Sequence, residues 1–261
     1  MIRFRRSCFA LFAVLVAVLA FQASPSANHR WRRYHWARTA NPFTIDLGKN
    51  LSTSWASYLT SASGDWSLSE VLNTSVVTGR TNAAQCNPTS GRVEVCNAAY
   101  GTNGWLGVAQ VWISGGQHIV QGTVKVNDTY FSSGKYNTAA WRQFVMCQEV
   151  GHTFGLDHQD ENFNNVNLGT CMDYTNDPDG SLQGELSNLH PDTHDYEELG
   201  IIYSHLDSAT TVGATAGGAA RAVNHPSEWG QLVKVAHGGK TQIFERHFGN
   251  GQIVVTFVIW A

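Results

Sequence analysis

The alternation of apolar and polar positions predicts a chain that mixes strands and helices, with five strands before the helix over 138–154. Five runs alternate or are rich in β-branched residues, and Gly or Asn bounds four of them. These predicted strands are residues 43–47, 71–78, 93–97, 105–113 and 118–126. Helical spacing predicts three helices, over 51–62, over 138–154 with Asn137 as its cap, and from Pro191 to about His205.

The remaining segments divide the chain. Residues 159–190 have no periodicity and are rich in Asn, Asp and Gly, which predicts a long functional loop. The small residues around 208–221 predict a linker, which we place at 207–224. The tail 225–261 holds three strand-like runs separated by Gly-rich turns, and we expect a small β-rich module that docks on the main domain.

Candidate chemistry is concentrated in the run CQEVGHTFGLDHQD at 147–160. Positions 148 and 152 are four apart, so they share one helix face, and two ligands there reach one ion. Glu149 lies beside them, where a general base would stand. Gly155 tolerates the left-handed conformation that ends a helix, so the chain turns back and His158 supplies a further ligand. Zinc prefers such nitrogen ligands.

The spacing of this run resembles the HExxHxxGxxH signature of the metzincin zinc endopeptidases, and GHTFGLDH is most similar to the matrixin and serralysin branches. The CMDY sequence at 171–174 resembles the family's methionine turn. The resemblance implies an α+β zincin domain over 43–206, with a mixed, largely five-stranded twisted sheet and catalysis on a central helix. It also implies that Met172 lies beneath the metal and that Tyr174 approaches the metal or the reaction oxyanion.

Gln148 stands where this signature has its first histidine. An amide oxygen is neutral and binds zinc less well than imidazole does. Three outcomes follow from the residue type: Gln148 is a weak ligand, Tyr174 or a water completes the shell, or the metal is lost and the fold survives as a binding scaffold.

The amino terminus and the cysteines both indicate secretion. A basic stretch, an unbroken apolar run over 9–21 and the small residues QASPSA predict a signal peptide at 1–26, cleaved near residues 20–27. Four cysteines then remain, an even number that suits an oxidising compartment. Three pairings are possible. We expect Cys86–Cys96, a short loop, and Cys147–Cys171, which would tie the active-site helix to the methionine turn.

Composition narrows the choice of partners. A net charge of −3 and 14% charged residues give no basis for nucleic-acid binding, and after the signal no segment is long and apolar enough for stable membrane insertion. We expect a secreted monomer that acts on a peptide or protein. The short segment 27–42 carries a basic cluster, which predicts a solvated stub or a surface that attracts membranes or cell walls. The acidic run 157–167 and the DPDG sequence at 177–180 suggest Ca²⁺, although a polar loop explains them better.

The first functional hypothesis is a secreted zinc metalloendopeptidase that hydrolyses peptide bonds through a zinc-bound water activated by Glu149. The strand at 105–113 would offer its edge to an extended substrate. The alternative is a catalytically impaired binding protein on a metzincin scaffold that has lost normal zinc ligation at Gln148. In a third hypothesis, the tail acts as a surface-anchoring module.

Overall fold

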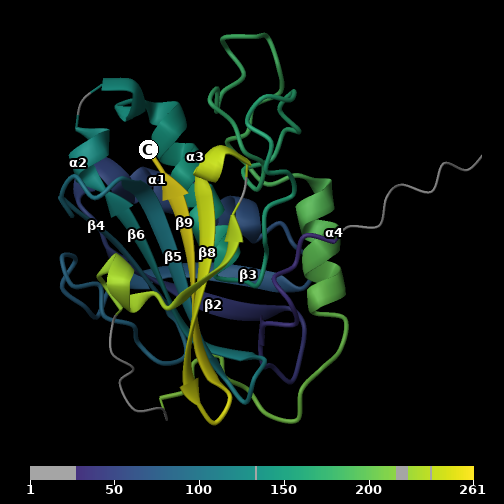
Figure 1. The fold of residues 1–261 in the computed structure, drawn as a ribbon. Coiled ribbons are helices and arrows are strands. Elements are labelled where there is room, and N and C mark those ends of the chain that lie inside the picture. Colours follow the sequence, from purple (N-terminus) through teal and green to yellow (C-terminus); the bar gives the residue numbers. More distant parts are fainter. Residues whose placement is uncertain (1–27, 133, 216–222, 236) are drawn as a thin grey trace, which may run out of the picture.

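The computed structural model describes residues 28–132, 134–215, 223–235 and 237–261. The predicted signal peptide and part of the predicted linker therefore lie outside the described residues. The chain forms a mixed α+β fold with one large sheet and few helices (Figure 1). The strands are β1 (His35–Trp36), β2 (Phe43–Asn50), β3 (Leu72–Thr78), β4 (Val93–Ala98), β5 (Trp105–Ser114), β6 (His118–Asn127), β7 (Gln231–Val235), β8 (Thr241–Gly249) and β9 (Gln252–Trp260). The α-helices are α1 (Thr53–Trp66), α2 (Asp128–Phe131), α3 (Ala139–His152) and α4 (Thr193–Ile202).

All of these strands belong to one sheet in the order β3-β2-β4-β6-β5-β9-β8-β7, and β1 pairs with β6. The pairs from β3 to β6 are parallel, whereas β5 runs antiparallel to both β6 and β9. The sheet is thus nine-stranded. The five-stranded sheet expected from the sequence was too small, because β9 of the tail pairs with β5, β8 and β7 follow it in the same sheet, and the short strand β1 pairs with β6.

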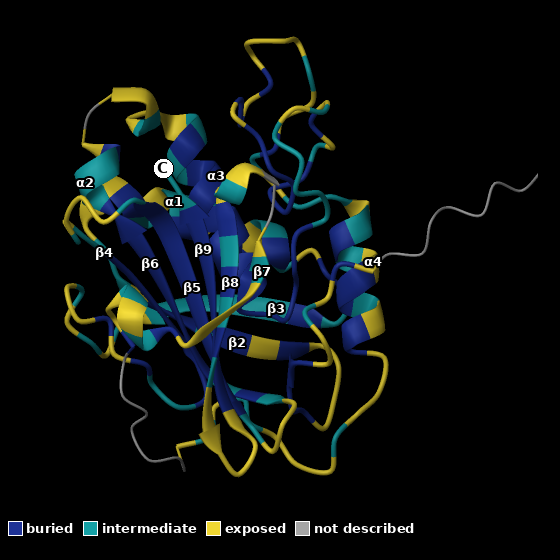
Figure 2. Ribbon diagram, in the orientation of Figure 1, coloured by how far each residue is buried: buried dark blue, intermediate teal, exposed yellow. Residues whose placement is uncertain are grey.

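Both faces of the sheet are covered, and Figure 2 shows its central strands buried. On one face, α1 and α3 pack through large apolar side chains that include Trp55, Trp66 and Phe144. On the other face, a smaller cluster joins Trp112 of β5 to Trp229 of the tail. Strand β5 is buried along nearly its whole length for this reason. In the described part of the chain, no helix is long and apolar enough to cross a bilayer.

The basic segment before β2 is packed, and the expectation of a solvated stub was wrong. Trp36 is fully buried, and its indole nitrogen donates to the Thr153 carbonyl at 2.9 Å. Arg38 is also buried, with its guanidinium over the Tyr203 ring and in contact with Asp207. The aromatic residues of this segment thus provide buried apolar surface, while the head groups of Arg32 and Arg38 contact carboxylates and a carbonyl oxygen.

Helix ends follow local chemistry, with small corrections. Thr138, rather than Asn137, caps α3, and its hydroxyl accepts from the Trp141 amide at 3.1 Å. Asp192 caps α4 in a capping box with Asp195, so this helix begins after Pro191 and ends at Ile202, short of His205. Both disulfides expected from the sequence are present, Cys86–Cys96 and Cys147–Cys171.

Candidate metal centre

Helix α3 and the turn after it bring the two histidines of the signature together. The chain leaves the helix at Thr153, and Gly155 adopts the expected left-handed conformation, with φ of 96°. A Cβ at Gly155 would lie 2.3 Å from the Tyr34 carbonyl oxygen, so the turn also needs glycine for space. The Nε2 atoms of His152 and His158 then lie 2.9 Å apart in the interior.

The tautomer of His152 is set by its surroundings. Its Nδ1 lies 2.9 Å from the Leu156 carbonyl oxygen, which can only accept a hydrogen bond. Nδ1 therefore carries the proton, and the lone pair of Nε2 points toward His158. Burial and the neighbouring His158 both lower the pKa of His152 well below its usual value, which favours the neutral imidazole that binds metals.

Gln148 lies on α3, one helical turn before His152. Its Nε2 donates to the Cys171 carbonyl at 2.8 Å, so the side chain has a fixed orientation. Its Oε1 is buried, and the described residues offer it no hydrogen-bond partner. The disulfide from Cys147 to Cys171 holds the helix and the methionine turn together at this point. An unpartnered, buried amide oxygen one helical turn before His152 has the chemistry of an oxygen ligand for a cation.

Glu149 lies on the side of α3 that faces strand β5 of the sheet. A Cβ at Gly107 would come within 2.5 Å of its Oε1, so β5 makes room for the carboxyl through this glycine. Burial raises the pKa of Glu149 well above its usual value, and a hydrogen bond from the Ala109 backbone opposes that rise only in part. Its Oε2 has no partner among the described groups, so this oxygen is available to bind or accept a proton.

The segment at 171–174 brings the apolar side chain of Met172 and the phenol of Tyr174 close to the two histidines. Met172 is fully buried, and its Sδ would lie 2.7 Å from a Cβ at Gly151, one residue before His152. The Tyr174 ring lies 4.7 Å from that of His158, and burial raises the pKa of its hydroxyl well above the usual value. That hydroxyl is also without a hydrogen-bond partner in the described structure.

Two acids and a lysine stand on the outer side of His158. Asp157 Oδ1 lies 3.4 Å from His158 Nδ1, which orients the ring. Lys234 of β7 places its ammonium 2.6 Å from both Asp157 and Glu161. These acids belong to the run that suggested calcium, but here a lysine neutralises them. In the DPDG sequence, the Asp177 carboxylate instead accepts from the Leu182 amide at 2.7 Å.

The centre is closed in this conformation. The side chains at positions 148, 149, 152, 158 and 174 are all 5% exposed or less. The Phe257 ring of β9 lies flat on His152, with centroids 4.3 Å apart and an interplanar angle of 8°. The tail thus covers the histidines from the sheet side.

The prediction that the strand at 105–113 offers a free edge was wrong. One edge of β5 pairs with β6, and the other pairs with β9 from Trp105 to Ile113. Sequence reasoning found the residues on α3 and in the methionine turn, but it missed Phe257 and Lys234, which lie far away in the chain. Gly107, a glycine inside a predicted strand, was a signal in the sequence that another group comes close to the backbone there. In the structure that group is the Glu149 carboxyl.

Comparison with known proteins does not assign this chain to a family. No family model matches this chain, and no curated protein matches it either. Among solved structures, the chain is similar to high choriolytic enzyme 1, a hatching-enzyme zinc protease from Oryzias latipes, the medaka fish. The two are 11% identical, the match covers 65% of this chain and 94% of that chain, and the TM-score is 0.34. A likeness this weak carries no argument about function.

Proposed function

We propose that this protein is a secreted zinc metalloendopeptidase whose metal ligands are His152, His158 and Gln148. The observation that carries the proposal is the 2.9 Å approach of the buried His152 and His158 Nε2 atoms, together with the unpartnered oxygens of Gln148 and Glu149 on the helix that carries His152. Natural proteins rarely leave several polar atoms unpaired in one buried place without a ligand or a chemical role for them. The two disulfides are consistent with an extracellular location.

Each residue has a distinct task in this proposal. A zinc ion held there would supply Lewis-acid polarisation of a peptide carbonyl and of a water. Glu149, which is not a ligand, takes a proton from that water and delivers it to the leaving amine. The raised pKa of its carboxyl suits a group that must hold a proton between the two steps. Tyr174 stands close enough to His158 to donate a hydrogen bond to a substrate oxyanion.

The position of β9 implies that the described conformation is latent. An extended substrate would have to pair with an edge strand beside α3, and β9 already occupies that edge of β5. Phe257 also fills the space next to His152. Hydrolysis would therefore require β9 to leave β5, at least locally.

A single variant tests the assignment of Glu149. Glu149→Gln keeps the side-chain shape and removes the base, so zinc content and thermal stability should stay close to those of the parent while hydrolysis of a generic protein substrate falls at least about 100-fold. Zinc content is measured by elemental analysis of the purified protein. If the variant cleaves the substrate as fast as the parent, Glu149 is not the base.

A second candidate function follows from the burial of the candidate metal centre beneath β9. If β9 never leaves β5, the same centre would be a buried zinc site in a non-catalytic secreted binding protein. Zinc bound tightly by the parent, with no hydrolysis of any protein substrate even after β9 is loosened, would favour this function over the peptidase. Absence of zinc from the parent would contradict both.

A further inference from the structure

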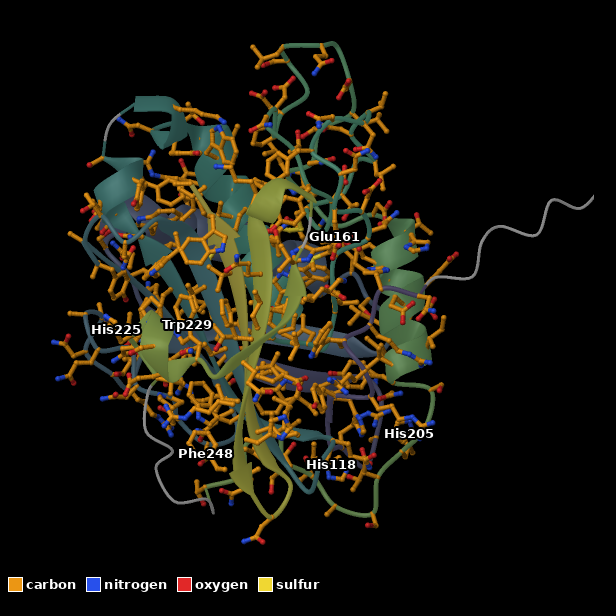
Figure 3. All side chains as sticks on the ribbon, viewed as in Figure 1. His118, Glu161, His205, His225, Trp229 and Phe248 are labelled. Atoms are coloured by element: carbon orange, nitrogen blue, oxygen red, sulfur yellow. A yellow bond between two sulfur atoms is a disulfide. The ribbon has the colours of Figure 1, made fainter. Side chains whose placement is uncertain are left out.

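Four metal-capable side chains from three distant parts of the sequence meet at another place in the molecule. They are His35 of β1, His118 at the start of β6, and His205 and Asp207 after α4. Figure 3 labels His118 and His205 toward the lower end of the molecule, whereas Glu161 of the candidate metal centre lies toward the upper end. We call these four residues the His35 cluster.

The ligand atoms of the His35 cluster converge on Asp207 Oδ1. This oxygen lies 3.4 Å from His35 Nε2, 3.3 Å from His118 Nε2 and 3.8 Å from His205 Nε2. The His35 and His205 Nε2 atoms are 3.2 Å apart. In a tetrahedral site with zinc–ligand bonds of 2.0–2.1 Å, neighbouring ligand atoms are separated by about 3.4 Å. The His35, His205 and Asp207 atoms all lie within 4.8 Å of one another, close to the spacing of a zinc coordination shell. His118 lies outside that group of three, and its contact with Asp207 Oδ1 places it beside the site.

Hydrogen bonds to residues outside the His35 cluster orient the ligand atoms of His35 and Asp207 toward the other members of the cluster. His35 Nδ1 lies 2.7 Å from the Arg33 carbonyl oxygen, so Nδ1 carries the proton and the lone pair of Nε2 faces the centre. The far oxygen of Asp207, Oδ2, accepts from the Arg38 guanidinium at 2.9 Å and from the Arg38 amide at 3.2 Å. Asp207 Oδ1 therefore stays free of Arg38 and points toward the histidines.

Without a cation, the contacts within the cluster depend on protons carried by the imidazoles. Three imidazole nitrogens surround one carboxylate oxygen, and two of them face each other across 3.2 Å, so at least one of these rings must be a donor. His118 Nε2 is also 3.2 Å from the Gln117 amide nitrogen, a contact that His118 would give up on binding a metal. His118 and His205 are 31% and 52% exposed, which leaves a path for an ion. A cavity of about 330 Å³ lined by His35 and His205 opens beside them.

We propose that His35, His205 and Asp207 form a structural zinc site, which His118 completes by moving from Asp207 toward the ion. Imidazole nitrogens and a carboxylate oxygen are ligands that zinc prefers, and a fourth protein ligand leaves no open position for catalysis. The site joins the amino-terminal segment, the start of β6 and the segment after α4. A zinc ion there would hold the strand that carries Trp36 and Arg38 against the domain, and so would stabilise the fold.

The test counts zinc in the intact mature protein. The variants are the double substitution His118→Ala/His205→Ala, whose side chains are partly exposed, and His152→Ala in the candidate metal centre. His247→Ala is the matched control, because that histidine is 61% exposed and lies in neither group. After dialysis against zinc and then zinc-free buffer, the double variant should retain about one zinc fewer per chain than the parent and the control. It should also lose most of the rise in melting temperature that added zinc gives.

Cobalt provides a second readout that is independent of activity. Co²⁺ bound to the parent or to His152→Ala should show the intense visible absorption of tetrahedral coordination. When His118→Ala and His205→Ala are added to His152→Ala, that absorption should disappear. The inference is overturned if the double variant binds as much zinc as the parent, or if His152→Ala alone removes all of it. If His152→Ala changes nothing while the double variant loses the only zinc, the His35 cluster stands and the peptidase centre fails.

Discussion

At the residue scale, Gln148 has a side chain with a fixed orientation, but its amide oxygen is a weak ligand for zinc. The hydrogen bond from its Nε2 to the Cys171 carbonyl holds the side chain, and its Oε1 has no hydrogen-bond partner among the described residues. A neutral amide oxygen binds zinc less strongly than an imidazole nitrogen. The fixed orientation therefore makes this position sensitive to substitution.

Gln148→His should raise zinc affinity, because it adds a third imidazole to His152 and His158. The melting temperature in the presence of zinc should rise with it, since a ligand that binds only the folded state stabilises that state. Competition with a chromophoric chelator measures the affinity. Unchanged affinity in a variant that still folds would remove Gln148 from the ligands.

Lys125 is a buried lysine that belongs neither to the candidate metal centre nor to the His35 cluster, and its pKa predicts how the stability of the fold depends on pH. Lys125 of β6 is 4% exposed, its ammonium contacts the Asn224 amide oxygen, and burial lowers its pKa from 10.5 to about 8. Between these values the unfolded chain binds more protons than the folded one, so stability rises as the pH increases from about 8 to about 10.5. At pH 7 this burial costs about 3 kcal/mol.

Lys125→Met should therefore raise the free energy of unfolding at pH 7, and the rise in stability above pH 8 should be smaller than in the parent. Urea unfolding at a series of pH values measures both quantities. Parallel pH profiles for the two proteins would show that Lys125 titrates normally in the folded state.

At the scale of elements, the disulfide Cys147–Cys171 fixes α3 against the methionine turn. It closes a loop across 24 positions that carries both histidines of the candidate metal centre. The turn has little regular structure of its own, so its position depends on this bond and on a few hydrogen bonds, such as that between Met172 and Gln159.

Cys147→Ala/Cys171→Ala should lower the free energy of unfolding by roughly 3 kcal/mol, the value expected for a loop of this length. It should also weaken zinc binding, because Gln148 reaches the site through its contact with Cys171. The double variant Cys86→Ala/Cys96→Ala is the control, since that pair lies outside the site and should affect stability alone. Equal zinc affinity in both double variants would contradict a role for Cys147–Cys171 in holding the centre.

At the scale of the whole molecule, the carboxyl-terminal strands contact a site built from a distant, earlier part of the chain. Phe257 contacts His152, and Lys234 contacts Asp157 and Glu161. Access to the site is thus coupled to the pairing of β9 with β5.

Phe257→Leu keeps an apolar side chain but removes the flat ring on His152, so zinc should be withdrawn faster by a chelator and hydrolysis should increase. Val254→Ala is the control, because Val254 belongs to the apolar cluster on the opposite face of the sheet. Greater effects from Val254→Ala than from Phe257→Leu would show that general loosening of β9, rather than cover over His152, controls access.

The sequence by itself determined the local features of this protein. Period-two alternation placed the strands, the four-residue spacing placed Gln148 and His152 on one helix face, and Gly155 marked the turn that returns His158, because each depends on neighbours in the chain. Tertiary structure alone decided that β9 lies beside β5 and that His35, His118 and Asp207 meet. Strand pairing and side-chain clusters between distant segments depend on how the whole sheet is assembled, and no periodicity within a segment records which partner it will have.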